Sequence, residues 1–166
     1  FVHELARATV SLGHEVHVLV PAHEGSADDV EMDGVKIYQR LPALKMMHRR
    51  SIDDSYVSLP RITMMTFMLR GMMELKKFVA QYELDIVHAH WAIPTGLVAT
   101  ASRWLHNKPV VITAHGRDLG LYSLSGQTRP PTWARPFTKF ALSSADKVIF
   151  TTPDYAELGC EYGITE

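Results

Sequence analysis

Short runs of β-branched and aliphatic residues alternate along this chain with longer segments that have helical spacing. The clearest runs cover residues 85–90, 109–114 and 147–151, and helical patterns follow at residues 94–105, at residues 132–144 and from Pro153 onward. Short apolar runs of this kind are typical of buried strands. Strands that alternate with helices predict a parallel sheet with helices on both faces. The alternation therefore predicts the α/β fold class.

The first eighty residues show the same alternation less clearly. Gly13 is placed to end a helix over residues 1–12, and residues 15–20 predict a strand. Residues 22–34 are polar, and the pair Asp33-Gly34 predicts a turn. Beyond this turn, the pattern predicts a short strand over 35–39, an irregular loop over 41–60 and a long helix over 61–82.

Length and composition exclude several classes of function. A chain of 166 residues is enough for one domain, so we expect residues 1–166 to form a single domain. Its 17 basic and 18 acidic residues give a net charge of −1, which excludes a nucleic-acid partner held by bulk electrostatics. Cys160 is the only cysteine, so an internal disulfide or a cysteine-based zinc site is excluded. No run of eighteen apolar residues predicts a membrane span.

Polar and ring-bearing side chains gather where the predicted strands end. Ligands of open parallel sheets bind at the carboxyl ends of the strands. His88 and His90 are two residues apart, so in a strand they face the same side. We expect seven residues at these strand ends to line a ligand site: His90, Trp91, Gly96, His115, Gly116, Arg117 and Thr152.

Structural roles remain open for several residues near this site. His88 can pack beneath a helix, and Asp118 and Thr152 can cap helices. The five methionines between residues 64 and 73 fit a plastic core. Basic residues around them also permit contact with a membrane surface. These basic residues are Lys45, Arg49, Arg50, Arg61, Arg70, Lys76 and Lys77.

The histidines raise a metal site as an alternative. His88, His90 and His115 are a ligand type that zinc accepts, but only Asp118 supplies a carboxylate nearby, and there is no HExxH motif. The glycine patterns of phosphate loops are absent, and so is the GxSxG pattern of one class of hydrolases. We therefore expect no metal or other cofactor, and keep a metal-dependent hydrolase as an open alternative.

Four regions, in chain order, resemble glycosyltransferase family 4. They are Phe1-Val-His-Glu-Leu-Ala-Arg with Leu12-Gly-His-Glu-Val-His-Val-Leu, then Asp85-Ile-Val-His-Ala-His-Trp, then Val110-Val-Ile-Thr-Ala-His-Gly-Arg-Asp, and finally Ala145-Asp-Lys-Val-Ile-Phe-Thr-Thr. The resemblance covers nearly the whole chain and is weakest over residues 22–83. The family usually has serine at the position of Thr152.

The resemblance implies the N-terminal, Rossmann-like half of a GT-B enzyme, truncated at both ends. Such enzymes have two Rossmann-like domains with the active site between them. They transfer a sugar from a nucleotide-diphosphate donor, with retention at the anomeric carbon and without a metal. By this resemblance, the first strand and its Gly-Gly loop precede Phe1 and lie in the sheet between the strands at 15–20 and 85–90. The nucleotide-binding domain follows Glu166.

The resemblance also implies roles for single residues. The family histidine that matches His115 contacts the transferred sugar, so His115 is the expected catalytic residue. The residues from His90 to Gly96 are expected on the acceptor side. The implied partners are a nucleotide sugar and a sugar or lipid-linked acceptor. We expect a cytoplasmic protein, with a peripheral contact at the inner face of the membrane through the basic region 45–77.

Two further functions remain open beside a retaining glycosyltransferase and the metal-dependent hydrolase. A sugar-nucleotide epimerase of the GT-B fold would need carboxylates in the strand-end loops, where Asp118 is the one obvious candidate. A non-catalytic α/β binding domain would use the same surface without chemistry.

Overall fold

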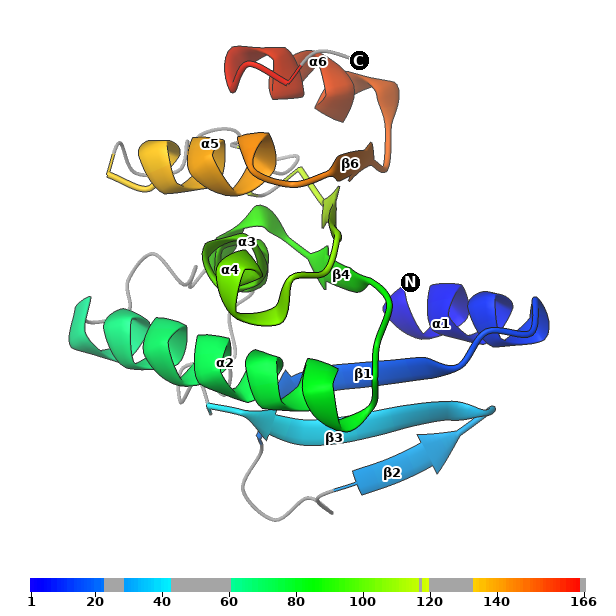
Figure 1. The fold of residues 1–166 in the computed structure, drawn as a ribbon. Helices are drawn as coiled ribbons and strands as arrows, with labels where there is room; N and C mark the ends of the chain where they lie inside the picture. The colour runs from blue at the N-terminus through cyan, green and yellow to red at the C-terminus, as the bar shows by residue number, and fades with distance from the viewer. Residues whose placement is uncertain (23–28, 43–60, 117, 120–132, 165–166) are drawn as a thin grey trace, which may run out of the picture. The chain divides into compact units, whose positions relative to one another are not determined.

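The computed structural model describes residues 1–22, 29–42, 61–116, 118–119 and 133–164, and the chain divides into two compact units (Figure 1). The first unit contains the elements up to the first two thirds of helix α2 (Arg61–Gln81). The second contains the end of α2 and the elements that follow it. We describe each unit by itself.

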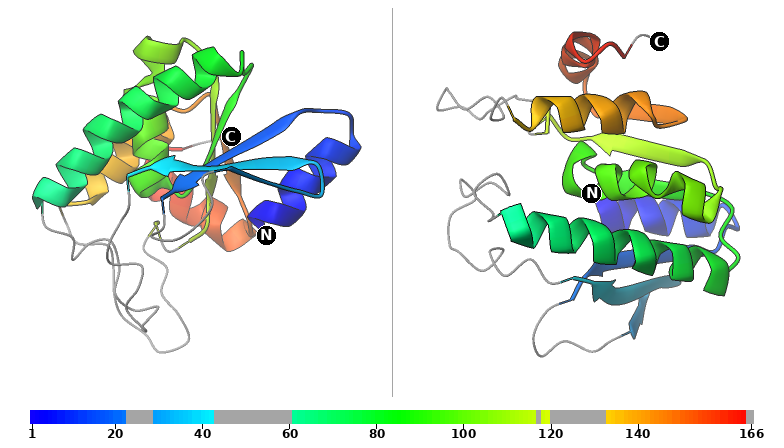
Figure 2. Two further views of the ribbon diagram at one scale, coloured as in Figure 1. Left: turned by 90° about the horizontal axis from the view of Figure 1, so that it is seen from below. Right: turned by 60° about the vertical axis from the view of Figure 1, so that its left-hand side comes forward.

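The first unit is built on a three-stranded sheet in the order β1-β3-β2. Strand β1 (Val16–Pro21) is parallel to β3 (Val35–Leu41), and β2 (Asp29–Met32) is antiparallel to β3. Figure 2 shows these strands from two further directions. Helix α1 (Val2–Ser11) precedes β1, and Gly13, with φ of +89°, follows the helix end as predicted.

The predicted turn at Asp33-Gly34 is confirmed, but it closes a hairpin that the sequence did not predict. Asp33 and Gly34 have φ values of 54° and 76°, as a two-residue hairpin turn requires. Strand β2 was missed because all four of its residues are exposed, so its sequence lacks the apolar alternation of a half-buried strand.

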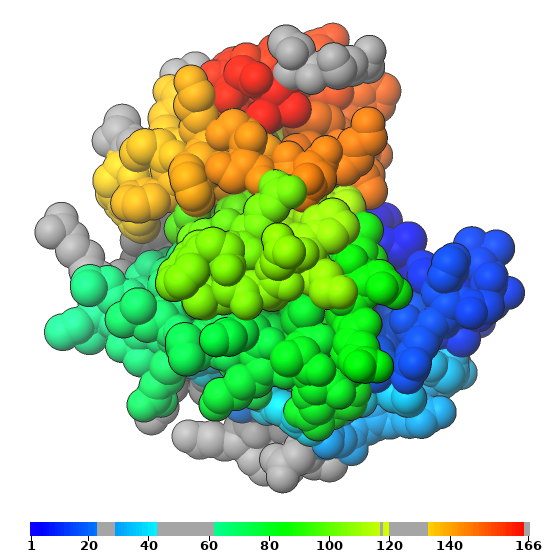
Figure 3. All heavy atoms as spheres, in the orientation of Figure 1, coloured from blue at the N-terminus to red at the C-terminus, as the bar shows by residue number. Residues whose placement is uncertain are grey.

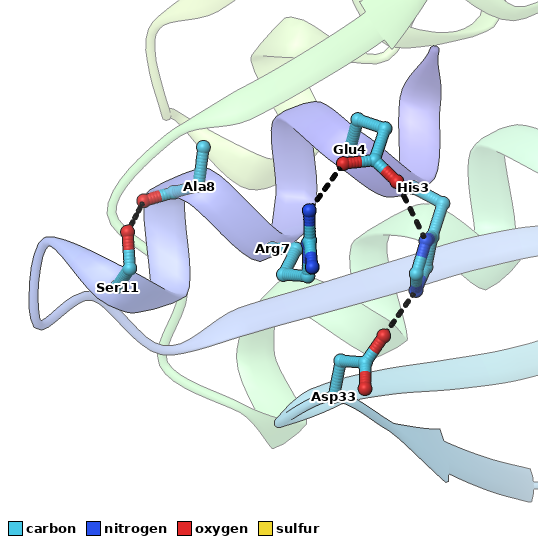
Figure 4. Close-up of polar contacts among 6 residues, drawn as sticks. All are labelled: His3, Glu4, Arg7, Ala8, Ser11 and Asp33. Carbon is cyan, nitrogen blue, oxygen red and sulfur yellow. Dashed lines mark hydrogen bonds and ion pairs between the residues drawn. The ribbon is translucent and has the colours of Figure 1, made fainter.

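Figure 4 shows polar contacts within helix α1 and one contact, from His3 to Asp33, between this helix and the hairpin turn. His3 Nε2 lies 3.3 Å from Asp33 Oδ2, and His3 Nδ1 lies 3.9 Å from Glu4 Oε1. Arg7 donates to Glu4 over 2.7 Å, and the Ser11 hydroxyl donates to the Ala8 carbonyl over 2.7 Å. The contact between His3 and Asp33 therefore brings the helix next to the turn.

The long helix predicted for 61–82 is confirmed as α2, but two of its methionines are exposed although the sequence suggested a core position. Phe67, Leu75, Phe78 and Val79 are buried. An apolar stripe on another face is exposed; its members are Ile62 (76%), Met65 (61%), Leu69 (63%) and Met73 (51%). The expectation that the methionine-rich segment is core is therefore wrong for Met65 and Met73. None of the helices within the described residues is long and apolar enough to cross a membrane.

The second unit contains the parallel sheet that the sequence predicted. Strands β4 (Val87–His90), β5 (Val110–Ala114) and β6 (Lys147–Phe150) lie in that order, and both neighbouring pairs are parallel. Val110, Ile112 and Ala114 of the central strand are fully buried. Three apolar side chains on the middle strand explain why β5 forms the core of this unit.

The helices of the second unit agree with the prediction except after β4. Helix α5 (Arg135–Ser143) packs against α3, and α6 (Pro153–Glu161) packs against β6. The helix predicted over 94–105 is divided at Ser102: η3 (Ala92–Gly96) and α3 (Leu97–Ala101) precede this residue, and α4 (Arg103–His106) follows it. Ile93 has extended backbone angles, and the Ser102 hydroxyl donates to the Val98 carbonyl, which favours a bend.

Candidate functional site

Three histidine rings meet at the carboxyl ends of β4 and β5. His90 is the last residue of β4 and is paired with Thr113, while His115 follows β5 directly. His90 Nδ1 lies 3.1 Å from His115 Nε2, and the two ring centroids are 5.4 Å apart. Residues 25 positions apart in the sequence therefore form one hydrogen-bonded pair, which confirms that these two strand ends come together.

The prediction that His88 and His90 face the same side of their strand is confirmed. Val87 and Ala89 are buried on the opposite side, and the rings of His88 and His90 stack with centroids 4.7 Å apart. His88 Nε2 lies 2.8 Å from Thr113 Oγ1. Thr113 is thus a site residue that sequence reasoning missed; its signal was its place on the strand beside the two histidines.

The surroundings of the three rings favour neutral imidazoles. Burial is the main cause that lowers the pKa of His90 to about 4, and its neighbours His88 and His115 lower it further. Burial also lowers the pKa of His88 and that of His115, although Asp118 opposes the shift at His115. At neutral pH, each ring therefore has one nitrogen that donates and one that accepts.

Trp91 is held beside this pair in an unusual backbone conformation. Its φ is +78°, which is rare for a bulky residue and costs roughly 1–3 kcal/mol. The Trp91 N–H donates to the Thr113 carbonyl over 2.9 Å, and the Trp91 carbonyl accepts from Gly96 N–H over 2.9 Å. The indole lies 6.0 Å from the His115 ring between centroids. The neighbouring strand and turn thus hold a strained residue at the site.

Asp118 joins the two loops that carry the site. Its Oδ2 accepts from Ala92 N–H over 2.6 Å, and its Oδ1 accepts from His115 N–H over 3.1 Å. The side chain is buried, and burial raises its pKa. Asp118 therefore has a role that the sequence did not reveal, since Ala92 lies 26 residues away. The helix that it was expected to cap would fall on residues outside the described ranges.

Two predicted site glycines allow close packing of the backbone. A Cβ at Gly96 would lie 2.8 Å from the Trp91 carbonyl oxygen and 2.9 Å from Ile112 Cδ1. Gly116 has a φ of +80°, and a Cβ there would overlap the ring of Tyr155. A side chain at either position would collide with neighbouring atoms, so the strand ends require glycine there. The contact of these two glycines with a substrate stays a prediction.

The structure assigns no contact with the histidine cluster to the other two predicted residues, Arg117 and Thr152, within the residues it describes. Arg117 lies outside the described residues. Thr152 lies between β6 and α6, directly before the helix, but its hydroxyl does not cap that helix. Its carbonyl accepts from Tyr155 N–H over 3.1 Å. Within the described ranges, the Thr152 side chain has no hydrogen bond to a histidine, so its role in substrate binding stays a prediction.

The histidine cluster does not have the arrangement of a metal site. In the part of the chain that the structure describes, no group of three or more His, Cys, Asp or Glu side chains could hold a metal ion. His90 and His115 direct ring nitrogens at each other, and both Asp118 oxygens accept backbone N–H groups. The cluster is thus arranged as neutral rings that bond one another.

Comparisons with known proteins agree with this fold. No functionally curated protein matches the sequence. Among solved structures, sucrose-phosphate synthase from Thermosynechococcus elongatus is similar, with a TM-score of 0.68 and 20% identity. The match covers 96% of this chain and 38% of that one, and it confirms the expected α/β, Rossmann-like fold of a GT-B half. The profile of Glycosyltransferase Family 4 matches residues 1–166. The chain therefore belongs to Glycosyltransferase Family 4.

Proposed function

We propose that this chain is the acceptor-binding part of a retaining glycosyltransferase, which moves a sugar from a nucleotide-diphosphate sugar to a sugar or lipid-linked acceptor. One observation carries the proposal: the bonded pair of His90 and His115 lies beside Trp91 at the carboxyl edge of a parallel sheet. Ligands of such sheets bind at this edge. The match to Glycosyltransferase Family 4 over the whole chain supports sugar transfer as the chemistry.

His115 has the properties that a sugar contact requires. A sugar presents hydroxyl groups that both donate and accept hydrogen bonds, and a neutral imidazole can do the same. The lowered pKa of His115 keeps the ring neutral at pH 7. Asp118 holds the His115 backbone in place, so the ring does not have to reorganise during the reaction. We assign His115 the contact with the transferred sugar.

Trp91 and the neighbouring loops supply the remaining contacts in this proposal. The indole of Trp91 offers an apolar face to the C–H groups of a sugar, and its backbone is fixed by Thr113 and Gly96. Gly116 and Arg117 follow His115 directly, and Thr152 follows the adjacent strand. These residues would line the acceptor and the transferred sugar.

The geometry of Asp118 favours transfer over epimerisation. An epimerase at this edge would need a carboxylate that can take a proton from its substrate. Asp118 is 9% exposed, and each of its oxygens accepts a backbone N–H. A carboxylate committed in this way supports the loops and is poorly placed to act as a base. The transferase is therefore the better supported of the two activities.

The test uses the intact protein that carries this chain, with a panel of nucleotide-diphosphate sugars and sugar or lipid-linked acceptors. His115→Ala is expected to lower kcat by roughly 100- to 1,000-fold, as for the loss of one preorganised transition-state contact. The exposed His14 supplies a matched control, since His14→Ala should leave turnover unchanged. Product anomers identical to the donor anomer are expected, and a metal chelator should have no effect. A folded His115→Ala variant with full turnover would overturn the assignment.

A peripheral membrane contact is a second part of the proposal, supported by the exposed stripe on α2. Ile62, Met65, Leu69 and Met73 follow one another at helical spacing, and Lys76 continues the same face one turn later. Figure 3 shows α2 at the molecular surface. An apolar face with adjacent lysines suits an anionic lipid surface. Such a surface would place a lipid-linked acceptor beside the enzyme at the cytoplasmic face of the membrane.

Vesicles of anionic lipid test this contact with the intact protein. The double substitution Met65→Glu and Leu69→Glu should weaken binding by at least about tenfold, because two apolar side chains no longer enter the lipid. Leu12→Glu, at an exposed leucine after α1, is the matched control. Binding should also fall as salt rises. Failure to bind at low salt would end this part of the proposal.

A further inference from the structure

The contact between His90 and His115 has a consequence for the proton positions of both rings. Their facing nitrogens, His90 Nδ1 and His115 Nε2, are 3.1 Å apart. A hydrogen bond at this distance needs one proton between the two nitrogens, so one ring donates and the other accepts. The tautomer of His115 is therefore tied to that of His90.

We propose that His90 is a positioning residue, which selects one neutral tautomer of His115 and fixes the direction of its ring. This inference rests on the proposed function, because it assigns His90 to the reaction through His115. It differs from the sequence-based expectation that His90 itself touches the substrate. A histidine ring is commonly oriented by the group that bonds its other nitrogen.

Neighbouring groups hold His90 in the position that this role requires. The ring of His88 stacks on it, with 4.7 Å between centroids and 26° between planes. His88 is in turn bonded to the Thr113 hydroxyl over 2.8 Å. The backbone of His90 is paired with Thr113 in the parallel ladder. The rings thus form a continuous series from Thr113 through His88 and His90 to His115.

His115 is consequently held by contacts from different parts of the unit. Asp118 bonds its backbone N–H, and His90 bonds its ring. The first contact places the main chain, whereas the second sets the remaining rotation and the proton. A ring held by these contacts meets a sugar hydroxyl with one defined donor or acceptor. A side chain that contacts the substrate in the transition state needs this orientation before the reaction begins.

Ring nitrogen NMR of the intact protein, with ¹⁵N-labelled histidine at pH 7.5, tests the inference directly. His106 is an internal reference, because its Nε2–H donates to the Ala99 carbonyl and its Nδ1 accepts from Lys108 N–H, both over 3.1 Å. We expect His115 to show a single tautomer in the wild type, as His106 does. In His90→Phe, which cannot form the bond, we expect a mixture. His14→Phe should leave the His115 signals unchanged.

Two amide substitutions separate positioning from direct contact. An asparagine side chain places its polar end near the Nδ1 of a histidine, and a glutamine side chain places it near Nε2. His90→Asn should therefore keep one His115 tautomer and most of kcat. His90→Phe and His90→Gln should lower kcat by about 10- to 100-fold, the scale seen for partners that orient metal-bound imidazoles, with little change in KM.

The outcomes distinguish this inference from the proposed function. A His115 tautomer that is the same in His90→Phe as in the wild type would overturn the positioning role. Rescue by glutamine instead of asparagine would also overturn it, since His90 would then act through Nε2. Full turnover in His115→Ala would reject the proposed function, and with it the catalytic meaning of the contact, even if the tautomer changes as expected.

Discussion

The two ends of the sheet β4-β5-β6 use the same residue types for different purposes. At the amino end, Asp146 accepts from Val110 N–H over 2.8 Å and from Arg103 over 2.6 Å, and both ring nitrogens of His106 bond the backbone. At the carboxyl end, Asp118 also bonds the backbone, but the histidine rings bond one another and Thr113. The His106 ring at the amino end therefore supports the backbone, whereas the histidine rings at the carboxyl end form a cluster.

The electrostatics of the two ends differ in the same way. Backbone and arginine hydrogen bonds lower the pKa of Asp146 at the exposed amino end, whereas burial raises the pKa of Asp118 at the carboxyl end. Burial also lowers the pKa values of His88, His90 and His115. The pKa shifts at the carboxyl end therefore favour uncharged side chains, which suit a ligand with neutral hydroxyl groups. This difference in electrostatics supports the carboxyl end as the functional end of the sheet.

The largest effect on stability is expected from the buried carboxylate. Asp118→Ala leaves two backbone N–H groups, those of Ala92 and His115, without their acceptor, at about 1–3 kcal/mol each. Asp146→Ala should cost less, because water can replace the lost acceptor at the exposed amino end. Thermal unfolding of the intact variants measures both losses. Equal losses of stability in Asp118→Ala and Asp146→Ala would contradict the proposed difference between the two ends of the sheet.

A somewhat smaller effect is expected at Gly116. Gly116→Ala combines a left-handed backbone, at roughly 1–2 kcal/mol, with overlap of the Tyr155 ring, at about 1–3 kcal/mol. Gly13→Ala is a matched control, because Gly13 also has a positive φ but a Cβ there would meet nothing within 4 Å. The difference between the two variants, measured by chemical denaturation, reports how tightly the carboxyl end is packed. A cost at Gly116 no greater than at Gly13 would contradict that packing.

The smallest predicted effect is a difference in pH dependence between the two ends. In the folded protein the pKa of His90 is about 4, whereas the ordinary value is 6.5. Between pH 6.5 and pH 4, the locally unfolded state therefore binds more protons than the folded state. Protection of the Trp91 amide, which bonds Thr113, should therefore fall as pH drops from 6.5 to 4. The Val110 amide should lose its bond to Asp146 only below the ordinary Asp pKa of 3.8.

Hydrogen exchange of these two amides measures the difference. The raised pKa of Asp118 acts in the opposite direction at the carboxyl end, so the histidine contribution is isolated with His90→Phe. That variant should flatten the pH dependence at Trp91 and leave Val110 unchanged. An identical pH profile for Trp91 in the wild type and the variant would show that His90 does not titrate as expected.

The sequence predicts those parts of the molecule whose signals are local. Alternation places His88 and His90 on one side of β4, and Gly13 ends α1 because glycine adopts positive φ readily. The parallel strands were recognised because buried strands are short, apolar and β-branched. Local patterns were therefore sufficient for the fold class and for the edge of the sheet on which the histidine cluster lies.

Features that depend on distant contacts could not be predicted. The bond from Asp118 to Ala92 joins residues 26 positions apart, and no local pattern marks it. The pattern predicted as one helix over 94–105 is divided at Ser102, between α3 and α4. The stripe from Ile62 to Met73 has the apolar spacing of a core face, but tertiary packing buries Phe67 and Phe78 instead. In each case, packing between segments decided the outcome.

The most direct test of the central claim is a crystal structure of the intact protein with a nucleotide-diphosphate sugar bound. The account predicts a sugar hydroxyl within about 3 Å of a ring nitrogen of His115, with His90 still bonded to that ring and Trp91 beside the sugar. A sugar bound elsewhere, with no contact to His115, would contradict the assignment of the functional site to the carboxyl ends of β4 and β5.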